Sequence, residues 1–169
     1  MAKQISLREF QQDLAQRLRD AQADSEQASR LGVRAGDRYW LLKLDDTDEV
    51  LPLPDVSPVP LTRPWYLGLA NIRGVMANVV DFAAFLGEEP TARTPDCRLV
   101  LAADRFQSYS GLLINRMMGL RNVHNLELLD QSHDEPWSSA VYRDREGRTW
   151  HELNMGALVA SDTFLSVGA

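Results

Sequence analysis

The second half of this chain repeats the first half in outline, and this repeat limits the possible folds more than any other feature. Gly74 precedes Asp81 by seven residues, and Gly147 precedes Asn154 by the same interval. Asp81 and Asn154 are of residue types that cap helices, and apolar residues follow both. Similar apolar runs stand about 60 residues apart, at 39–44 (YWLLKL) and 98–103 (RLVLAA). Two copies of a strand, turn, strand, loop, strand and short-helix unit predict two similar small β-rich lobes.

Local signals also favour a mainly β fold class. Four prolines between residues 49 and 62 forbid a helix and predict an extended segment at a sheet edge, because proline cannot donate to a strand ladder. The run ending at Val80 is typical of a strand. Asp81 then has the position of a helix N-cap and Gly87 that of a helix stop, so a short helix is expected between them.

The first 36 residues have the pattern of an N-terminal amphipathic helical arm, residues 1–36. Ser6 and Glu9 stand at the spacing of a capping box, which marks a helix start. Five apolar residues then fall on one stripe of a helix: Leu7, Phe10, Leu14, Leu18 and Ala21. Such stripes usually face a core, so we expect this one to pack on the body of the protein itself. Another copy of the chain or a different partner remains an open alternative.

The charge balance argues against nucleic acid and lipid as partners. The chain has 18 Lys and Arg residues against 24 Asp and Glu residues, a net charge of −6, and no basic run. Polar residues interrupt its longest apolar stretches far short of the ~20 residues that span a bilayer, so no membrane insertion is expected. The N-terminus lacks the apolar core of a signal peptide, and a single cysteine, Cys97, excludes an internal disulfide framework. These features predict a cytoplasmic protein.

Recognised catalytic motifs are missing from the sequence. It contains no nucleotide-binding glycine loop, no H-E-x-x-H zinc helix and no G-x-S-x-G nucleophile elbow. The most enzyme-like segment runs from His124 to Glu135, and its metal-ligand types are His124, Asp130, His133, Asp134 and Glu135. Their spacing matches no regular helix face and is typical of a solvated loop. We therefore expect no catalytic residue, no metal and no cofactor, with a small-ligand or metal-dependent enzyme using this segment as the alternative.

The segment from Pro64 to Gly87, PWYLGLANIRGVMANVVDFAAFLG, resembles the signature of CheW-like domains, the family of chemotaxis coupling proteins. In that signature, Asn-apolar-Arg-Gly is followed by a strand, an aspartate cap and a short helix. Residues 71–74 (NIRG) match the turn, and Asp81 matches the cap. With the strand pairs at both ends, the resemblance covers residues 37–165.

The resemblance implies a CheW-like domain at residues 37–169, made of two five-stranded, SH3-like β-barrels. The first barrel would lie at 37–87 and the second at 96–153, followed by a short C-terminal helix at 154–165. It also implies a non-enzymatic adaptor in two-component signal transduction. Such an adaptor couples the cytoplasmic tip of a methyl-accepting chemoreceptor to the regulatory domain of a CheA-type histidine kinase.

The same resemblance places a receptor-binding groove at the Asn-apolar-Arg-Gly turn and at the second strand of the first barrel. The matching residues are Asn71, Ile72, Arg73, Gly74, Val56 and Val59. An arginine at a glycine turn presents a rigid fork of donors that suits a carboxylate or helix-end carbonyls on a partner. Alternatively, Arg73 closes the turn by bonding carbonyls of its own chain.

Three positions depart from the family pattern. Pro58 stands where an acidic residue is common, Ala77 where proline is common, and Ala83 near the place of a common basic residue. These departures favour a partner set outside flagellar chemotaxis. We therefore expect a version that serves type IV pili in twitching motility, of the PilI type.

Overall fold

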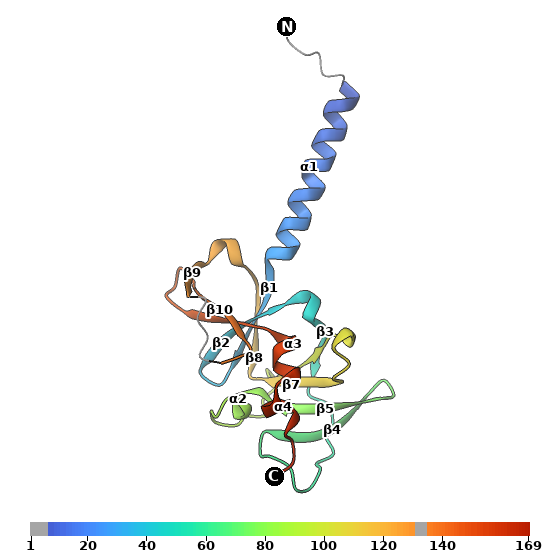
Figure 1. The fold of residues 1–169 in the computed structure, drawn as a ribbon, viewed down its shortest axis with the longest axis vertical. Coiled ribbons are helices and arrows are strands. Elements are labelled where there is room, and N and C mark those ends of the chain that lie inside the picture. Colours follow the sequence, from blue (N-terminus) through green and yellow to red (C-terminus); the bar gives the residue numbers. More distant parts are fainter. Residues whose placement is uncertain (1–6, 131–134) are drawn as a thin grey trace.

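Two β-sheets make up the body of the protein, and one long helix projects from it (Figure 1). The structure, a computed structural model, describes residues 7–130 and 135–169. Sheet A has six strands in the order β8-β1-β2-β11-β10-β9, and sheet B has five in the order β3-β6-β7-β5-β4. The predicted mainly β fold with an N-terminal helix is confirmed. Sheet A has one strand more than the resemblance implied.

The strands and helices have the following bounds. Sheet A contains β1 (Ser29–Ala35), β2 (Arg38–Lys43), β8 (Arg116–Asn122), β9 (Glu127–Asp130), β10 (Ser138–Arg143) and β11 (Thr149–Leu153). Sheet B contains β3 (Thr47–Pro52), β4 (Tyr66–Ile72), β5 (Val75–Asp81), β6 (Arg98–Ala102) and β7 (Ser110–Ile114). The α-helices are α1 (Leu7–Ala28), α2 (Phe82–Phe85), α3 (Met155–Ala160) and α4 (Asp162–Leu165). Short 3-10 helices are η1 (Leu44–Asp46), η2 (Asp104–Phe106) and η3 (Val123–Asn125).

Each sheet takes strands from both repeats of the chain. In sheet B, the β6–β7 hairpin of the second repeat pairs with β3 and, in parallel, with β5 of the first. In sheet A, the β1–β2 hairpin of the first repeat pairs with β8 and, in parallel, with β11 of the second. The structure therefore corrects the expected succession of barrels at 37–87 and 96–153. Sequence patterns predict strands, but pairing between distant segments leaves no local signal.

Strand β1 corrects the expected boundary of the N-terminal arm at residue 36. The helix ends at Ala28, and residues 29–35 pair with both β2 and β8. Leu31, Val33 and Ala35 are buried and alternate with half-buried Arg30 and Arg34, a period-two pattern already present in the sequence. β1 and β6 (98–102) occupy the same place in the strand orders of sheets A and B. The counterpart of β6 in the first repeat is therefore β1, and not the run at 39–44.

The main core lies between the two sheets and includes the short helices. It combines buried residues of sheet A, sheet B, α2, α3 and α4 in one cluster. Aromatic rings connect these parts: the Trp40 ring lies 5.1 Å from that of Phe82, and the Phe85 ring contacts those of Trp65, Trp137 and Phe164. Because both sheets contribute to this cluster, they form one packing unit.

Helix α1 extends away from the body along most of its length (Figure 1). Its large apolar residues are exposed, at 74% for Leu7, 55% for Phe10, 49% for Leu14 and 60% for Leu18. The prediction that this stripe packs on the protein's own body is therefore wrong. The cores of the body are formed by residues outside this stripe, and the helix leaves the body at its C-terminal end. Among the described residues, no helix is both long and apolar enough to span a bilayer.

Two short helices begin at the repeated caps that the sequence predicted. The Asp81 side chain accepts a hydrogen bond from the Ala84 amide, and the Asn154 side chain accepts one from the Ala157 amide. Asp81 is 2% exposed and also accepts bonds of 2.8 Å from the amide and the hydroxyl of Thr91. Asp81 therefore joins the helix cap to the connector between the two repeats.

The proline-bearing segment follows the edges of sheet B. Strand β3 is an edge strand that ends at Pro52, and Ser57 exchanges two backbone hydrogen bonds with Leu69 on the other edge strand, β4. A Cβ atom at Gly68, where φ is 129°, would lie 2.1 Å from the Ser57 carbonyl oxygen. Glycine at this position is what allows the segment to approach β4.

Replacing Asp81 by alanine should lower the free energy of unfolding by about 3 kcal/mol, because the cap is lost and the buried Thr91 donors lose their acceptor. The matched change Asn154→Ala removes an exposed cap alone and should lower it by about 1 kcal/mol. Urea unfolding measures both values. Equal losses in the two variants would contradict the second role of Asp81.

The change Gly68→Ala should lower the free energy of unfolding by about 3 kcal/mol, since the backbone of residues 57–58 has to move. At Gly74 an added Cβ meets nothing within 4 Å, so Gly74→Ala should lower it by only about 1 kcal/mol, from backbone strain. Urea unfolding of both variants makes the comparison. A loss at Gly68 no larger than that at Gly74 would refute the close-approach argument.

Candidate protein-binding site

The candidate site is centred on the tight turn between β4 and β5. Ile72 and Val75 are the last paired residues of this hairpin, so Arg73 and Gly74 form a two-residue loop. Both have positive φ, 52° for Arg73 and 85° for Gly74, as a type I′ turn requires. The Asn71 side chain accepts a 2.8 Å hydrogen bond from the Gly74 amide and so supports the turn. The sequence motif Asn-apolar-Arg-Gly is thus a hairpin turn.

Arg73 occupies a backbone conformation that a non-glycine residue adopts at an energetic cost of about 1 kcal/mol. Its side chain is 73% exposed, so burial of the side chain does not offset this strain. A residue kept in a strained and exposed position is a candidate for function, because stability alone would favour glycine there.

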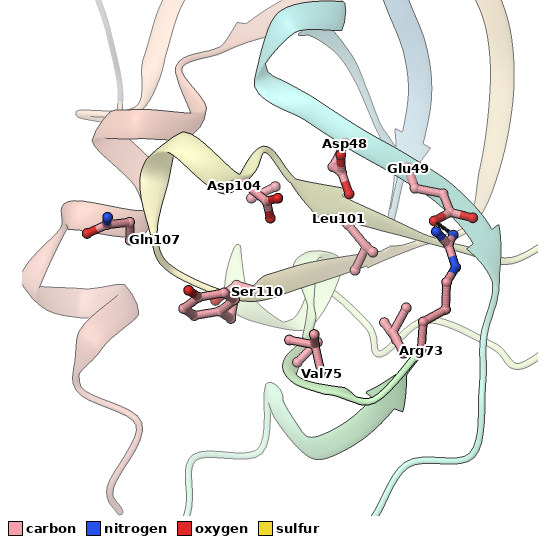
Figure 2. A pocket seen from close by; sticks show the side chains of 12 residues that line it. Asp48, Glu49, Arg73, Val75, Leu101, Asp104, Gln107 and Ser110 are labelled. Atoms are coloured by element: carbon pink, nitrogen blue, oxygen red, sulfur yellow. Dashed lines mark hydrogen bonds and ion pairs between the residues drawn. The ribbon is translucent and has the colours of Figure 1, made fainter.

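The guanidinium of Arg73 forms an ion pair with Glu49 on β3 (Figure 2). Strand β3 lies at one end of the strand order of sheet B, and the β4–β5 hairpin lies at the other. The sheet therefore curls until its two ends meet at this pair. The sequence leaves open whether Arg73 contacts a partner or bonds the carbonyls of its own turn. In the structure, its guanidinium bonds the Glu49 carboxylate of its own chain. Glu49 was missed in the sequence, since no pattern connects residues 24 positions apart.

An open cavity of about 380 Å³ lies beside this ion pair. Figure 2 shows Asp48, Glu49 and Asp104 along one side of it, and Arg73 and Val75 along the other. Ile72, Ala77 and Leu101 add apolar surface. The rim of the cavity carries three carboxylates and one guanidinium, so it is acidic. Together with the apolar surface, this rim suits a partner side chain that has an apolar stem and a basic end.

The structure brings some of the predicted groove residues together. Val56 and Ile72 pack against the same small apolar cluster, formed by Ala70, Val79 and Leu99 inside the curl of sheet B. Val59 is 37% exposed and does not belong to this cluster. Ile72 and Val56 thus lie together, whereas Val59, further along the same proline-bearing segment, lies outside this cluster.

The alternative site at His124–Glu135 is described only in part. His124 is exposed, with its amide bonded to the Asn122 side chain. Glu135 accepts a 2.6 Å bond from Arg38. His133 and Asp134 lie outside the described residues. Within residues 7–130 and 135–169, no group of three or more metal-ligating side chains comes together.

Comparison with known proteins gives two curated relatives over part of the chain. It is 29% identical to Protein PilI of Pseudomonas aeruginosa over 94 residues, which cover 56% of this chain and 52% of that protein. It is 26% identical to Chemotaxis protein CheW of Rhizobium meliloti over 101 residues, which cover 58% of this chain and 63% of that protein. The chain therefore spans between half and two thirds of the length of these relatives.

The fold is similar to that in the crystal structure of the scaffolding protein TtCheW from Thermoanaerobacter tengcongensis. The TM-score is 0.61 at 14% sequence identity, over 75% of this chain and 88% of that one. The model of the CheW-like domain matches residues 30–163, most of the chain. This match begins inside β1, which agrees with the corrected boundary of the arm. The chain belongs to the family of CheW-like domain proteins, a family of non-enzymatic scaffolding proteins.

Proposed function

We propose that this protein is a cytoplasmic adaptor that couples the tip of a methyl-accepting chemoreceptor to the regulatory domain of a CheA-type histidine kinase. The match of the CheW-like domain over residues 30–163 is the observation that carries this proposal. The similarity to PilI, together with the departures at Pro58, Ala77 and Ala83, favours an output through type IV pili.

The receptor-binding surface of this proposal is the curl of sheet B around the β4–β5 turn. Arg73, Asn71 and Gly74 define the turn, Ile72 and Val56 supply apolar contacts, and Val59 extends the surface along the proline-bearing segment. A helical hairpin fits such a groove through apolar side chains spaced one turn apart. The acidic rim formed by Asp48, Glu49 and Asp104 adds a preference for basic groups on that hairpin.

The first test is a pull-down from a lysate of the source organism, with bound chains identified by mass spectrometry. The wild type should recover a histidine kinase and a chemoreceptor, and Arg73→Glu should lose the receptor while keeping the kinase. Arg145→Glu, in the β10–β11 turn of the other sheet, is the matched control and should keep both. Recovery of neither protein by the wild type would refute the adaptor function.

A charge swap then separates the two roles of Arg73. If Arg73 acts only by holding Glu49, the double variant Arg73→Glu, Glu49→Arg restores the ion pair and should restore receptor binding. If Arg73 contacts the receptor, as we propose, the swap should leave binding as weak as in Arg73→Glu, by about 10-fold or more. Thermal unfolding should shift little in either variant, because exposed ion pairs contribute under about 1 kcal/mol. Full rescue by the swap would contradict direct contact.

A further inference from the structure

Helix α1 presents an apolar stripe that no part of the described body covers. Only Ala28, at its C-terminal end, is buried. Leu7, Phe10, Leu14 and Leu18 are each about half or more exposed. An isolated helix of 22 residues gains little stability from propensity alone, since most helical stability in proteins comes from packing of an apolar face. The stripe is therefore an interaction surface.

The charge of the helix argues against a membrane surface as its partner. Between Leu7 and Ala28 it carries three arginines against five carboxylates. Helices that lie on membranes have polar faces rich in Lys and Arg, which anionic lipid attracts. An acidic helix on a chain of net charge −6 would be repelled instead.

The stripe has the periodicity of a helix that pairs over several turns. Leu7 and Leu18 are eleven residues apart, as are Phe10 and Ala21. An 11-residue repeat corresponds to about 3.67 residues per turn, so the apolar positions stay on one face of a nearly straight helix. A second straight helix can therefore follow the stripe along its whole length.

We propose that the occupant is α1 of a second copy of this chain, paired antiparallel about Leu14. In this register Leu14 meets Leu14, Leu7 lies opposite Ala21, and Phe10 lies opposite Leu18. At each end of the pair, Leu7 faces the small Ala21, and in the next layer the bulky Phe10 faces Leu18. Large and small side chains therefore alternate across the contact, which keeps the distance between the two helix axes constant along the pair. A parallel pair would instead stack Phe10 on Phe10 at one end and alanines on each other at the other end.

Charges on the border of the stripe also favour the antiparallel pair. Asp13 and Arg17 lie on the same flank and form an exposed ion pair of 2.9 Å within one helix. An antiparallel pair brings this flank of each helix against the same flank of the other. Arg17 of one copy then lies at the level of Gln11 of the other, about 3 Å along the axis from Asp13. Two symmetric Arg17–Asp13 pairs between copies follow, and the two helix dipoles oppose each other.

The shape of the molecule permits this arrangement. Residues 22–28 separate the last apolar layer from the body by about 10 Å of helix. Figure 1 shows the body at the C-terminal end of α1, so the two bodies would lie at opposite ends of an antiparallel helix pair. The paired helices therefore leave the β4–β5 turn and the cavity beside it uncovered in both copies.

Sedimentation equilibrium of the full chain tests the pairing. The wild type should be a dimer that dissociates on dilution, and Leu14→Glu should weaken the association by at least about 100-fold, because two carboxylates meet at the centre. Gln12→Glu adds the same charge on the opposite face of the helix and should leave the dimer intact. Glutamate is a good helix former, so circular dichroism should show that monomeric helices persist. A wild type that stays monomeric at high concentration would overturn the proposal.

Disulfide trapping tests the orientation. The native Cys97 is buried, so new cysteines on α1 report on the helix contact. Leu14→Cys should form a disulfide-linked dimer, Leu7→Cys alone should not, and a mixture of Leu7→Cys with Ala21→Cys should link the two variants. Efficient linking of Leu7→Cys to itself would show a parallel pair and overturn the antiparallel register.

Discussion

Two parallel strand pairs hold the body of this protein together. β5 pairs with β7, and β11 pairs with β2, so that each pair joins one repeat of the chain to the other. Parallel neighbours need a long connection, and here the rest of the repeat supplies it. Sheet A cannot form from a continuous half of the chain, because β1 and β2 lie at residues 29–43 and its other strands lie at 116–153. The strands of sheet B all lie within residues 47–114, between these two parts. The core between the sheets, which includes both Trp40 and Phe82, is completed only when both repeats are in place.

Two ion pairs join segments that are not neighbours in their sheets. In sheet A, Arg30 on β1 bonds Glu152 on β11 at 2.8 Å, across the intervening β2, and both side chains are nearly buried. In sheet B, Arg73 and Glu49 join opposite ends of the strand order at an exposed rim. The buried pair would leave an uncompensated charge if broken, so its role is structural. The exposed pair contributes little to stability, which leaves its groups available to a partner.

Helix α1 differs from the body because its large apolar side chains are exposed. Its stripe of Leu7, Phe10, Leu14 and Leu18 is exposed, and it belongs to neither of the two apolar clusters of the body. Pairing of two such helices would link two copies of the chain and place two candidate binding surfaces on one particle. Linked sites raise the effective concentration of each partner for the other, which is useful in a scaffold.

The sequence by itself determined the mainly β class, the Asp81 and Asn154 caps, the Arg73–Gly74 turn and the amphipathic character of α1. These features depend on residues within a few positions of one another, where backbone sterics and local hydrogen bonds decide the outcome. Only the tertiary structure decided that β1 and β2 pair with strands of the second repeat, that Glu49 pairs with Arg73, and that α1 projects from the body. Each of these depends on which distant surfaces meet, and long-range pairing is set by the packing of the whole chain, not by any local pattern.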